Sequence, residues 1–156
     1  MKEIEGDLIA LALAGRFDLI VHGCNCFCAM GAGIALQIRD RFPQVYEADL
    51  NTQSGDRSKL GTYSSAQVTE NRTGFTVING YTQFHFSGQG RLADYGAIEQ
   101  LFTKLKADFP GVRMGYPKIG AGLAGGNWDT ISGIIDTALD GEDHTLVLWP
   151  GRQKRT

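Results

Sequence analysis

The sequence predicts a single α/β domain in which helices cover both faces of a mixed sheet. Strand-like and helix-like segments alternate along most of the chain, an order typical of parallel strands joined by crossover helices. The strand-like segments are short, apolar and rich in β-branched residues, as buried strands are. Two of them flank residues 70–74 so closely that an antiparallel hairpin is expected. The 156 residues suffice for one domain with its own core.

The predicted elements follow one another in a regular order. Strands are predicted at residues 2–5, 19–24, 61–69, 75–81, 112–119 and 145–149. Helices are predicted at residues 8–14, 34–42, 45–53, 91–109 and 127–139. Asp7 is expected to cap the first helix, and Asp94 and Asp129 stand where caps of the last two helices are expected. Pro117 lacks an N–H group, which predicts an edge or terminal position in the sheet.

Composition and charge argue against several classes of protein. Hydrophobic residues make up 42% of the chain and charged residues 21%, which argues against disorder. The net charge of −2 and a pI near 5.9 argue against nucleic acid as a partner. No run of about 18 apolar residues occurs, so no membrane span is expected, and the N-terminus does not resemble a signal peptide. We expect residues 1–150 to form one monomeric domain, followed by a solvated basic tail at residues 151–156.

The cysteines indicate a reducing environment. Cys24, Cys26 and Cys28 are odd in number and lie too close together to form a disulfide framework, which predicts a cytoplasmic protein. The alternation of His22 with the three cysteines does not match the usual spacing of zinc knuckles. We therefore expect neither a metal nor a cofactor, and we expect Cys26 and Cys28 to line or underlie a binding loop.

Glycines gather in two loops, each between a predicted strand and the helix that follows it. The first loop contains Gly31-Ala32-Gly33, and the second spans residues 120–126. Ligands of open α/β sheets bind at the carboxyl ends of strands, where free N–H groups at helix N-termini favour anions. Two such loops facing each other would hold a diphosphate between main-chain amides, without cationic side chains. The alternative is that each loop is only a tight strand-to-helix turn.

These loops and their flanks resemble the macrodomain family along nearly the whole chain. The front motifs are Gly6-Asp7-Leu8, His22-Gly23-Cys24-Asn25-Cys26, Met30-Gly31-Ala32-Gly33-Ile34-Ala35 and Arg41-Phe42-Pro43. The back motif runs from Pro117-Lys118-Ile119 through the glycines to Asn127-Trp128. The branches that the chain resembles most are the ADP-ribose 1″-phosphate phosphatases and the terminal ADP-ribose–glutamate hydrolases, together with related phage proteins.

The resemblance implies a three-layer α/β/α sandwich with a mixed central sheet and a cleft for ADP-ribose or a derivative, free or attached to a protein. The ligand-binding residues that it implies are Asp7, Leu8, Asn25, Met30, Gly31, Ala32, Gly33, Ile34, Ile119, Gly120, Ala121, Gly122, Leu123, Ala124 and Trp149. Asp7 would accept from the adenine amino group, Asn25 would contact the distal ribose, and Trp149 would stack near the adenine. The alternatives are a helix cap for Asp7, a turn residue for Asn25 and a core position for Trp149.

The resemblance implies chemistry as well as binding. The glutamate hydrolases use a Lys and an Asp, which by position would fall near Gln67 and on Ala124, so the lysine-dependent mechanism does not fit. The phosphatases have a His before a Cys-Asn pair, as His22 stands here. We therefore expect His22 and Asn25 to be catalytic in hydrolysis of ADP-ribose 1″-phosphate, with His22 protonating the leaving oxygen or activating water. Strand alternation places His22 and Asn25 on opposite faces, so a core histidine is the alternative.

Two further functions stay open at this point. One is a reader that binds ADP-ribose without turning it over, and the other is a hydrolase of ADP-ribosyl esters such as O-acetyl-ADP-ribose. His85, in the aromatic segment 81–86, could border the cleft, and Lys118 could meet a phosphate.

Overall fold

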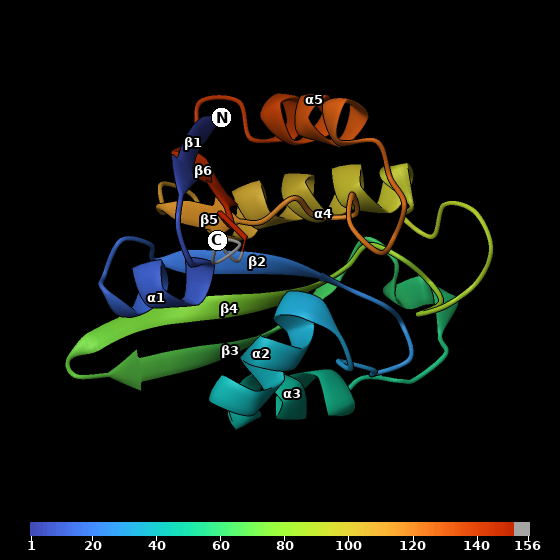
Figure 1. Cartoon of the computed structure of the whole chain (residues 1–156), viewed down its shortest axis with the longest axis horizontal. Coiled ribbons are helices and arrows are strands. Elements are labelled where there is room, and N and C mark those ends of the chain that lie inside the picture. The colour runs from blue at the N-terminus through green and yellow to red at the C-terminus, as the bar shows by residue number, and fades with distance from the viewer. Residues whose placement is uncertain (152–156) are drawn as a thin grey trace, which may run out of the picture.

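The computed structural model describes residues 1–151 and has a six-stranded mixed sheet between two layers of helices (Figure 1). The strand order is β1-β6-β5-β2-β4-β3. The strands are β1 (Lys2–Glu5), β2 (Leu19–Cys24), β3 (Tyr63–Glu70), β4 (Thr73–Tyr81), β5 (Met114–Tyr116) and β6 (His144–Leu148). The helices are α1 (Leu8–Leu13), α2 (Gly33–Arg41), α3 (Pro43–Leu50), α4 (Tyr95–Asp108) and α5 (Trp128–Ala138), with a 3₁₀ turn η1 (Arg57–Lys59). The basic residues predicted for the tail, Arg152, Lys154 and Arg155, lie outside the described residues.

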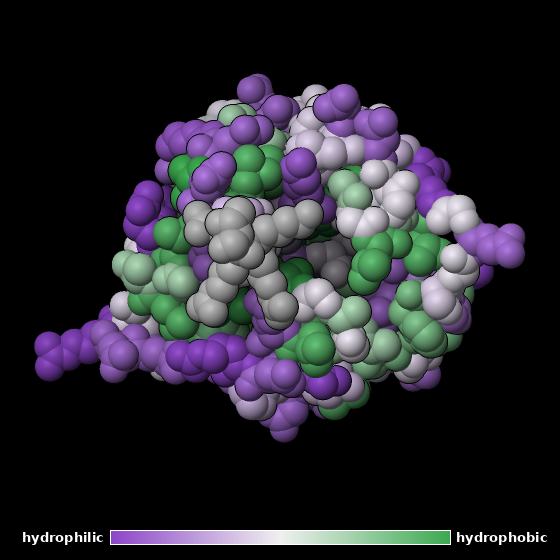
Figure 2. All heavy atoms as spheres, in the orientation of Figure 1, coloured by the Kyte–Doolittle hydropathy of each residue, from purple (hydrophilic) through white to green (hydrophobic). Residues whose placement is uncertain are grey.

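The expected α/β/α sandwich is confirmed. Helices α4 and α5 cover one face of the sheet, and α1, α2 and α3 cover the other (Figure 1). Strands β1, β6, β5, β2 and β4 are parallel, and only β3 pairs antiparallel, with β4. The predicted hairpin is therefore present, and its hydrophilic tip projects on the left of Figure 2.

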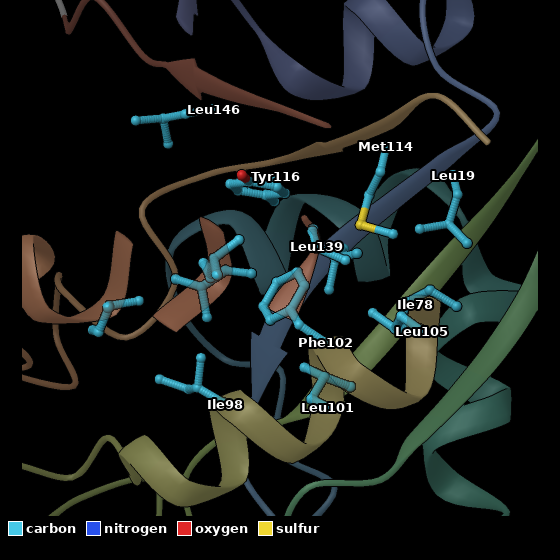
Figure 3. Packing of buried hydrophobic residues seen from close by; sticks show 14 of the residues in the cluster. Leu19, Ile78, Ile98, Leu101, Phe102, Leu105, Met114, Tyr116, Leu139 and Leu146 are labelled. Carbon is cyan, nitrogen blue, oxygen red and sulfur yellow. The ribbon is translucent and has the colours of Figure 1, made fainter. Parts of the chain in front are cut away.

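Two hydrophobic cores hold the layers together because successive side chains of a strand point to opposite faces. Leu19 and Val21 of β2 pack toward α4 and α5, and the intervening Ile20 packs toward α1 and α2. Figure 3 shows the first core, in which Phe102 of α4 meets Tyr116 of β5 edge to face, with ring centroids 5.6 Å apart. Both side chains are fully buried.

The structure corrects several predicted boundaries. The strand predicted at residues 112–119 is only Met114–Tyr116 and lies in the interior of the sheet, so Pro117 marks its end and not an edge. The backbone leaves the sheet after Pro117, because the Ile119 amide donates locally to Pro117 O at 2.7 Å. No helix in residues 1–151 is long and apolar enough to cross a membrane.

Two helix starts also differ from the prediction. Helix α4 begins at Tyr95 and not at residue 91, because Asp94 caps it by accepting from Ala97 N at 2.9 Å. Helix α5 is capped by Asn127, whose Oδ1 accepts from Thr130 N at 3.1 Å. Asp129, which was expected to be the cap, lies in the first turn of α5.

Candidate ligand-binding cleft

A cleft of about 580 Å³ opens where the parallel strands β5, β2 and β4 end. Its volume lies within the range of small-molecule binding sites. To the right of the centre of Figure 2, the surface is hollowed between α2 and the loop after β5. The lining residues are Gly23, Cys24, Asn25, Ala29, Gly31, Ala32, Gly33, Ile34, Ala35, Gln83, Phe86, Pro117, Lys118, Ile119, Gly120, Gly122, Leu123 and Ala124. Both predicted glycine loops therefore border one cleft.

The N-terminus of α2 supplies the first group of free amides. Helices α1, α4 and α5 each begin with an Asp or Asn side chain that satisfies an early amide, whereas α2 has no capping side chain. Within the described residues, no protein acceptor is bonded to the amides of Gly33, Ile34 and Ala35. Gly33 adopts a φ of +58°, which few other residues tolerate. The start of α2 thus presents unsatisfied N–H groups and the positive end of its dipole to the cleft.

The loop between β5 and α5 supplies a second group. Gly120 has a φ of +75°, and its carbonyl accepts from Gly126 N at 2.7 Å. A Cβ on Gly126 would lie 2.5 Å from that carbonyl oxygen, so only glycine closes the turn there. In the part of the chain that the structure covers, the amides of Gly120, Gly122, Leu123 and Ala124 donate to no protein acceptor.

The side chains of the cleft are almost all uncharged. Lys118 is the one cationic residue in the lining, and it is exposed to solvent. No carboxylate and no imidazole occurs among the lining residues. The Cys24 thiol remains protonated, because burial raises its pKa well above the usual value. An anion in this cleft would therefore be held mainly by main-chain N–H groups, as at other helix N-termini.

Asn25 organises the loop that carries the first glycines. Its Nδ2 donates to Ala29 O at 2.7 Å, and its Oδ1 accepts from Phe27 N at 2.9 Å. The side chain also lines the cleft and is 8% exposed. Asn25 therefore lies at the site that the sequence predicted, with an amide already engaged in shaping the loop.

The structure does not bring His22 to the cleft. The imidazole is fully buried on the face of the sheet that α3 covers, and it is not among the lining residues. Its Nε2 lies 2.6 Å from Asn79 Oδ1, and Asn79 Nδ2 donates to Val45 O at 3.0 Å. Nε2 must then carry the hydrogen. Burial lowers the pKa of His22 to about 4, although the bond to Asn79 acts in the opposite direction. This geometry favours the alternative of a core histidine.

Other implied ligand-binding residues also lie outside the cleft lining: Asp7, Leu8, Met30, Ala121 and Trp149. Leu8 is buried in the core beneath α1, and Met30 is buried in a smaller cluster with Cys24, Cys26 and Tyr81. Asp7 caps α1, with Oδ1 accepting from Ala10 N at 3.1 Å. Trp149 is 63% exposed, so it is not a core residue. Because Glu5 pairs with Leu148, Asp7 and Trp149 leave the sheet at the same carboxyl edge as the cleft.

Some lining residues, such as Gln83 and Phe86, are not among the ligand-binding residues predicted from the sequence. Gln83 and Phe86 follow β4, whose parallel pairing with β2 brings its carboxyl end to the cleft. The aromatic segment after the hairpin is a signal for these residues, but no local pattern predicts that β4 pairs with β2. Gln67, by contrast, lies on the edge strand β3 and donates to Thr76 Oγ1 at 2.8 Å. It is not a lining residue.

Cys24 ends β2 and lines the cleft, whereas Cys26 and Cys28 belong to the loop between β2 and α2 and contact neighbouring segments. Cys26 Sγ donates to Gln83 O at 3.5 Å, and Cys28 Sγ donates to Asp49 O at 3.2 Å. All three thiols are free. Across residues 1–151, no group of three or more His, Cys, Asp or Glu side chains is arranged to hold a metal ion.

Comparison with known proteins identifies relatives of the whole chain. No protein-family model matches it. An uncharacterized 17.5 kDa protein of Enterobacteria phage T4 is 39% identical over 156 residues, which cover 96% of each chain. A DNA ADP-ribosyl glycohydrolase of Mycobacterium tuberculosis is 25% identical over 148 residues. That alignment covers 93% of this chain and 40% of the relative, so the chain spans less than half of that enzyme.

Solved structures show the same fold. The macrodomain of Thermus aquaticus DarG superposes with a TM-score of 0.72 at 21% identity, covering 96% of this chain and 97% of the other. Thermosipho africanus DarTG in complex with ADP-ribose superposes with a TM-score of 0.72 at 16% identity, covering 98% of this chain and 43% of the other.

The burial of His22 predicts an abnormal titration. The folded-state pKa of about 4 lies below the ordinary value of 6.5, so the folded chain binds fewer protons than the unfolded chain between these values. His22 therefore contributes roughly 3 kcal/mol to the free energy of unfolding above about pH 6.5, and this contribution is lost as the pH falls toward 4. Proton NMR of the imidazole should show a neutral ring from about pH 8 to about pH 5. A midpoint near 6.5 would contradict the buried geometry.

Proposed function

Because this chain belongs to the macrodomain family, we propose that its cleft binds ADP-ribose or a close derivative. The observation that carries the proposal is the presence of two groups of free amides on opposite borders of the cleft, one at the start of α2 and one at Gly120, Gly122, Leu123 and Ala124. Lys118 is the one charged residue in the lining. A diphosphate between the two groups of amides would accept hydrogen bonds from both sides. The solved neighbour that contains ADP-ribose has the same fold.

The order of the strands suggests how the rest of the ligand would lie. Along the carboxyl edge, β1 and β6 come first, then β5, β2 and β4. Asp7 and Trp149 follow β1 and β6, so an adenine would lie at this end, with its amino group donating to the Asp7 carboxylate. The cap of α1 uses Asp7 Oδ1 and leaves Oδ2 for the base. The diphosphate would cross the end of β5, and the distal ribose would reach Asn25 after β2.

Hydrolysis at the distal ribose is the second candidate function. The likeness to a DNA ADP-ribosyl glycohydrolase favours a hydrolase, and ADP-ribose 1″-phosphate is the substrate that the sequence resemblance implies. The lining contains no carboxylate or imidazole, so the amides near Gly31 would have to polarise the phosphate while a bound water attacks phosphorus. The bond from phosphorus to the 1″ oxygen of the ribose would break, and the proton of the water would pass to that departing oxygen. In this proposal Asn25 orients the distal ribose, and His22 stays in the core.

A side chain added at Gly122 should block binding without disturbing the fold. A Cβ at Gly122 would have no atom within 4 Å, so Gly122→Val should fold normally and fill the cleft. We expect its affinity for ADP-ribose in isothermal titration to fall by more than about tenfold. Gly133→Val is the matched control, because Gly133 has equally open space on α5, away from the cleft. Equal affinities of the two variants would contradict the proposal.

The two roles of Asp7 can be separated by substitution. Asp7→Ser keeps a capping side chain but removes the carboxylate, whereas Asp7→Ala removes both. Both variants should bind ADP-ribose more weakly by ~1–3 kcal/mol if the carboxylate accepts from adenine. Only Asp7→Ala should also lose stability, by ~1 kcal/mol in urea unfolding. Unchanged affinity in Asp7→Ser would remove adenine recognition from this residue.

Turnover distinguishes the hydrolase from a reader. Purified protein incubated with ADP-ribose 1″-phosphate should release phosphate. His22→Gln should retain that rate, because the imidazole lies outside the cleft, provided that circular dichroism confirms folding. Tight binding of ADP-ribose without any phosphate release would leave the domain a reader. A rate abolished in folded His22→Gln would return His22 to the mechanism.

A further inference from the structure

One side-chain amide in the cleft lining has a free oxygen atom. Gln83 follows β4 and lines the cleft. Its Nε2 donates to His85 O at 2.9 Å, which holds the amide in one orientation, because only the nitrogen of the amide can donate to a carbonyl. Within residues 1–151, no protein group donates to Gln83 Oε1. The cleft therefore contains an oriented hydrogen-bond acceptor that the fold itself does not use.

The other polar side chains of the lining do not offer such an acceptor. Asn25 Oδ1 already accepts from Phe27 N at 2.9 Å. The Cys24 thiol is only a weak acceptor, and the Lys118 ammonium carries donors alone. The remaining lining residues are glycines or carry apolar side chains. Since the main-chain amides of the cleft are donors, Gln83 Oε1 is the side-chain oxygen left to accept a hydrogen bond from a hydroxyl or a water.

Gln83 lies beside the place proposed for the distal ribose. Strands β2 and β4 are parallel neighbours, so the segments that follow them leave the sheet at the same edge (Figure 1). The two segments stay in contact, because Cys26 N donates to Phe84 O at 2.9 Å and Cys26 Sγ donates to Gln83 O at 3.5 Å. Asn25, at which the proposed ligand ends, directly precedes Cys26. The free oxygen of Gln83 is therefore at the end of the cleft where a group on the distal ribose would react.

We propose that Gln83 positions the attacking water when a phosphate is hydrolysed from the distal ribose. The inference rests on the second candidate function, hydrolysis of ADP-ribose 1″-phosphate. A water that donates one hydrogen to Gln83 Oε1 presents a lone pair to the phosphorus, while the amides near Gly31 hold the phosphate oxygens. Glutamine suits this task, since it orients the attacking water in other phosphoryl-transfer sites.

The step balances without an acid or a base from the protein. The water oxygen forms a bond to phosphorus, the bond from phosphorus to the 1″ oxygen breaks, and a proton of the water passes to that departing oxygen. The products are ADP-ribose and inorganic phosphate. The carboxamide of Gln83 gains and loses no proton, so its contribution is the orientation of the water. This role agrees with a lining that contains no carboxylate and no imidazole.

Steady-state kinetics of two Gln83 variants test the assignment. Gln83→Met has a similar length but no acceptor, whereas Gln83→Glu keeps an acceptor oxygen, and both lose the donor to His85 O. Gln83→Met should lower kcat for ADP-ribose 1″-phosphate by roughly tenfold to a hundredfold, the effect of a misplaced reactant. Its KM and its Kd for ADP-ribose should stay close to those of the wild type, because the water and not the nucleotide loses its partner. Gln83→Glu should keep a kcat at least about fivefold above that of Gln83→Met, although its charge should raise KM.

The control and the contrary outcomes separate this role from support of the loop. Gln67→Met is the matched control, because Gln67 has the same side chain on β3 outside the cleft lining, and its kcat should equal that of the wild type. An unchanged kcat in Gln83→Met would refute the assignment and leave the proposed hydrolysis standing. Equal losses of kcat in both Gln83 variants, or a parallel loss of ADP-ribose affinity, would make Gln83 a loop-supporting residue instead. If wild-type protein binds ADP-ribose but releases no phosphate, this inference fails together with the hydrolysis, and the binding proposal stands.

Discussion

The proposed site depends on main-chain amides that the fold leaves without acceptors. A helix normally satisfies its first amides with a capping side chain, and α1, α4 and α5 do so through Asp7, Asp94 and Asn127. Helix α2 instead begins at a glycine after Ala32, which offers no capping atom. Together with the turn at residues 120–124, this leaves two sets of donors on opposite borders of one cleft. Anion affinity would then come from backbone geometry and not from net charge.

Such donors are useful only if the loops that carry them are held in place. Beneath the loop of residues 25–32 lies a buried polar network. Tyr81 Oη donates to Asp49 Oδ1 at 2.8 Å, and Lys59 Nζ donates to Cys26 O at 3.3 Å. Burial raises the pKa of Asp49, and the Tyr81 hydroxyl partly offsets that effect. His22 and Asn79 extend the network across β2 and β4. Asp49, Lys59, Asn79, Tyr81 and His22 therefore support the loop from below and are not among the residues that line the cleft.

The sequence was sufficient for the fold class, the hairpin and the glycine loops, because these depend on local periodicity and on residues with special backbone freedom. It was insufficient where tertiary contacts decide. Leu92 continues the apolar periodicity of α4, yet its amide donates to Ala124 O at 2.8 Å, outside the helix. The place of His22 in a motif predicts catalysis, whereas its burial follows from tertiary packing on the sheet face that α2 and α3 cover, where Asn79 of β4 joins it to Val45 of α3. Phe86 enters the cleft through the pairing of β2 with β4, which no local pattern encodes.

The most direct test of the amide-bound diphosphate is a titration of ¹⁵N-labelled protein with ADP-ribose, followed by amide chemical shifts. The account predicts that the amides of residues 31–35 and those of residues 120–124 shift together, along one saturation curve. Shifts confined to one loop, or a response centred on Lys118 with the loop amides unmoved, would contradict it.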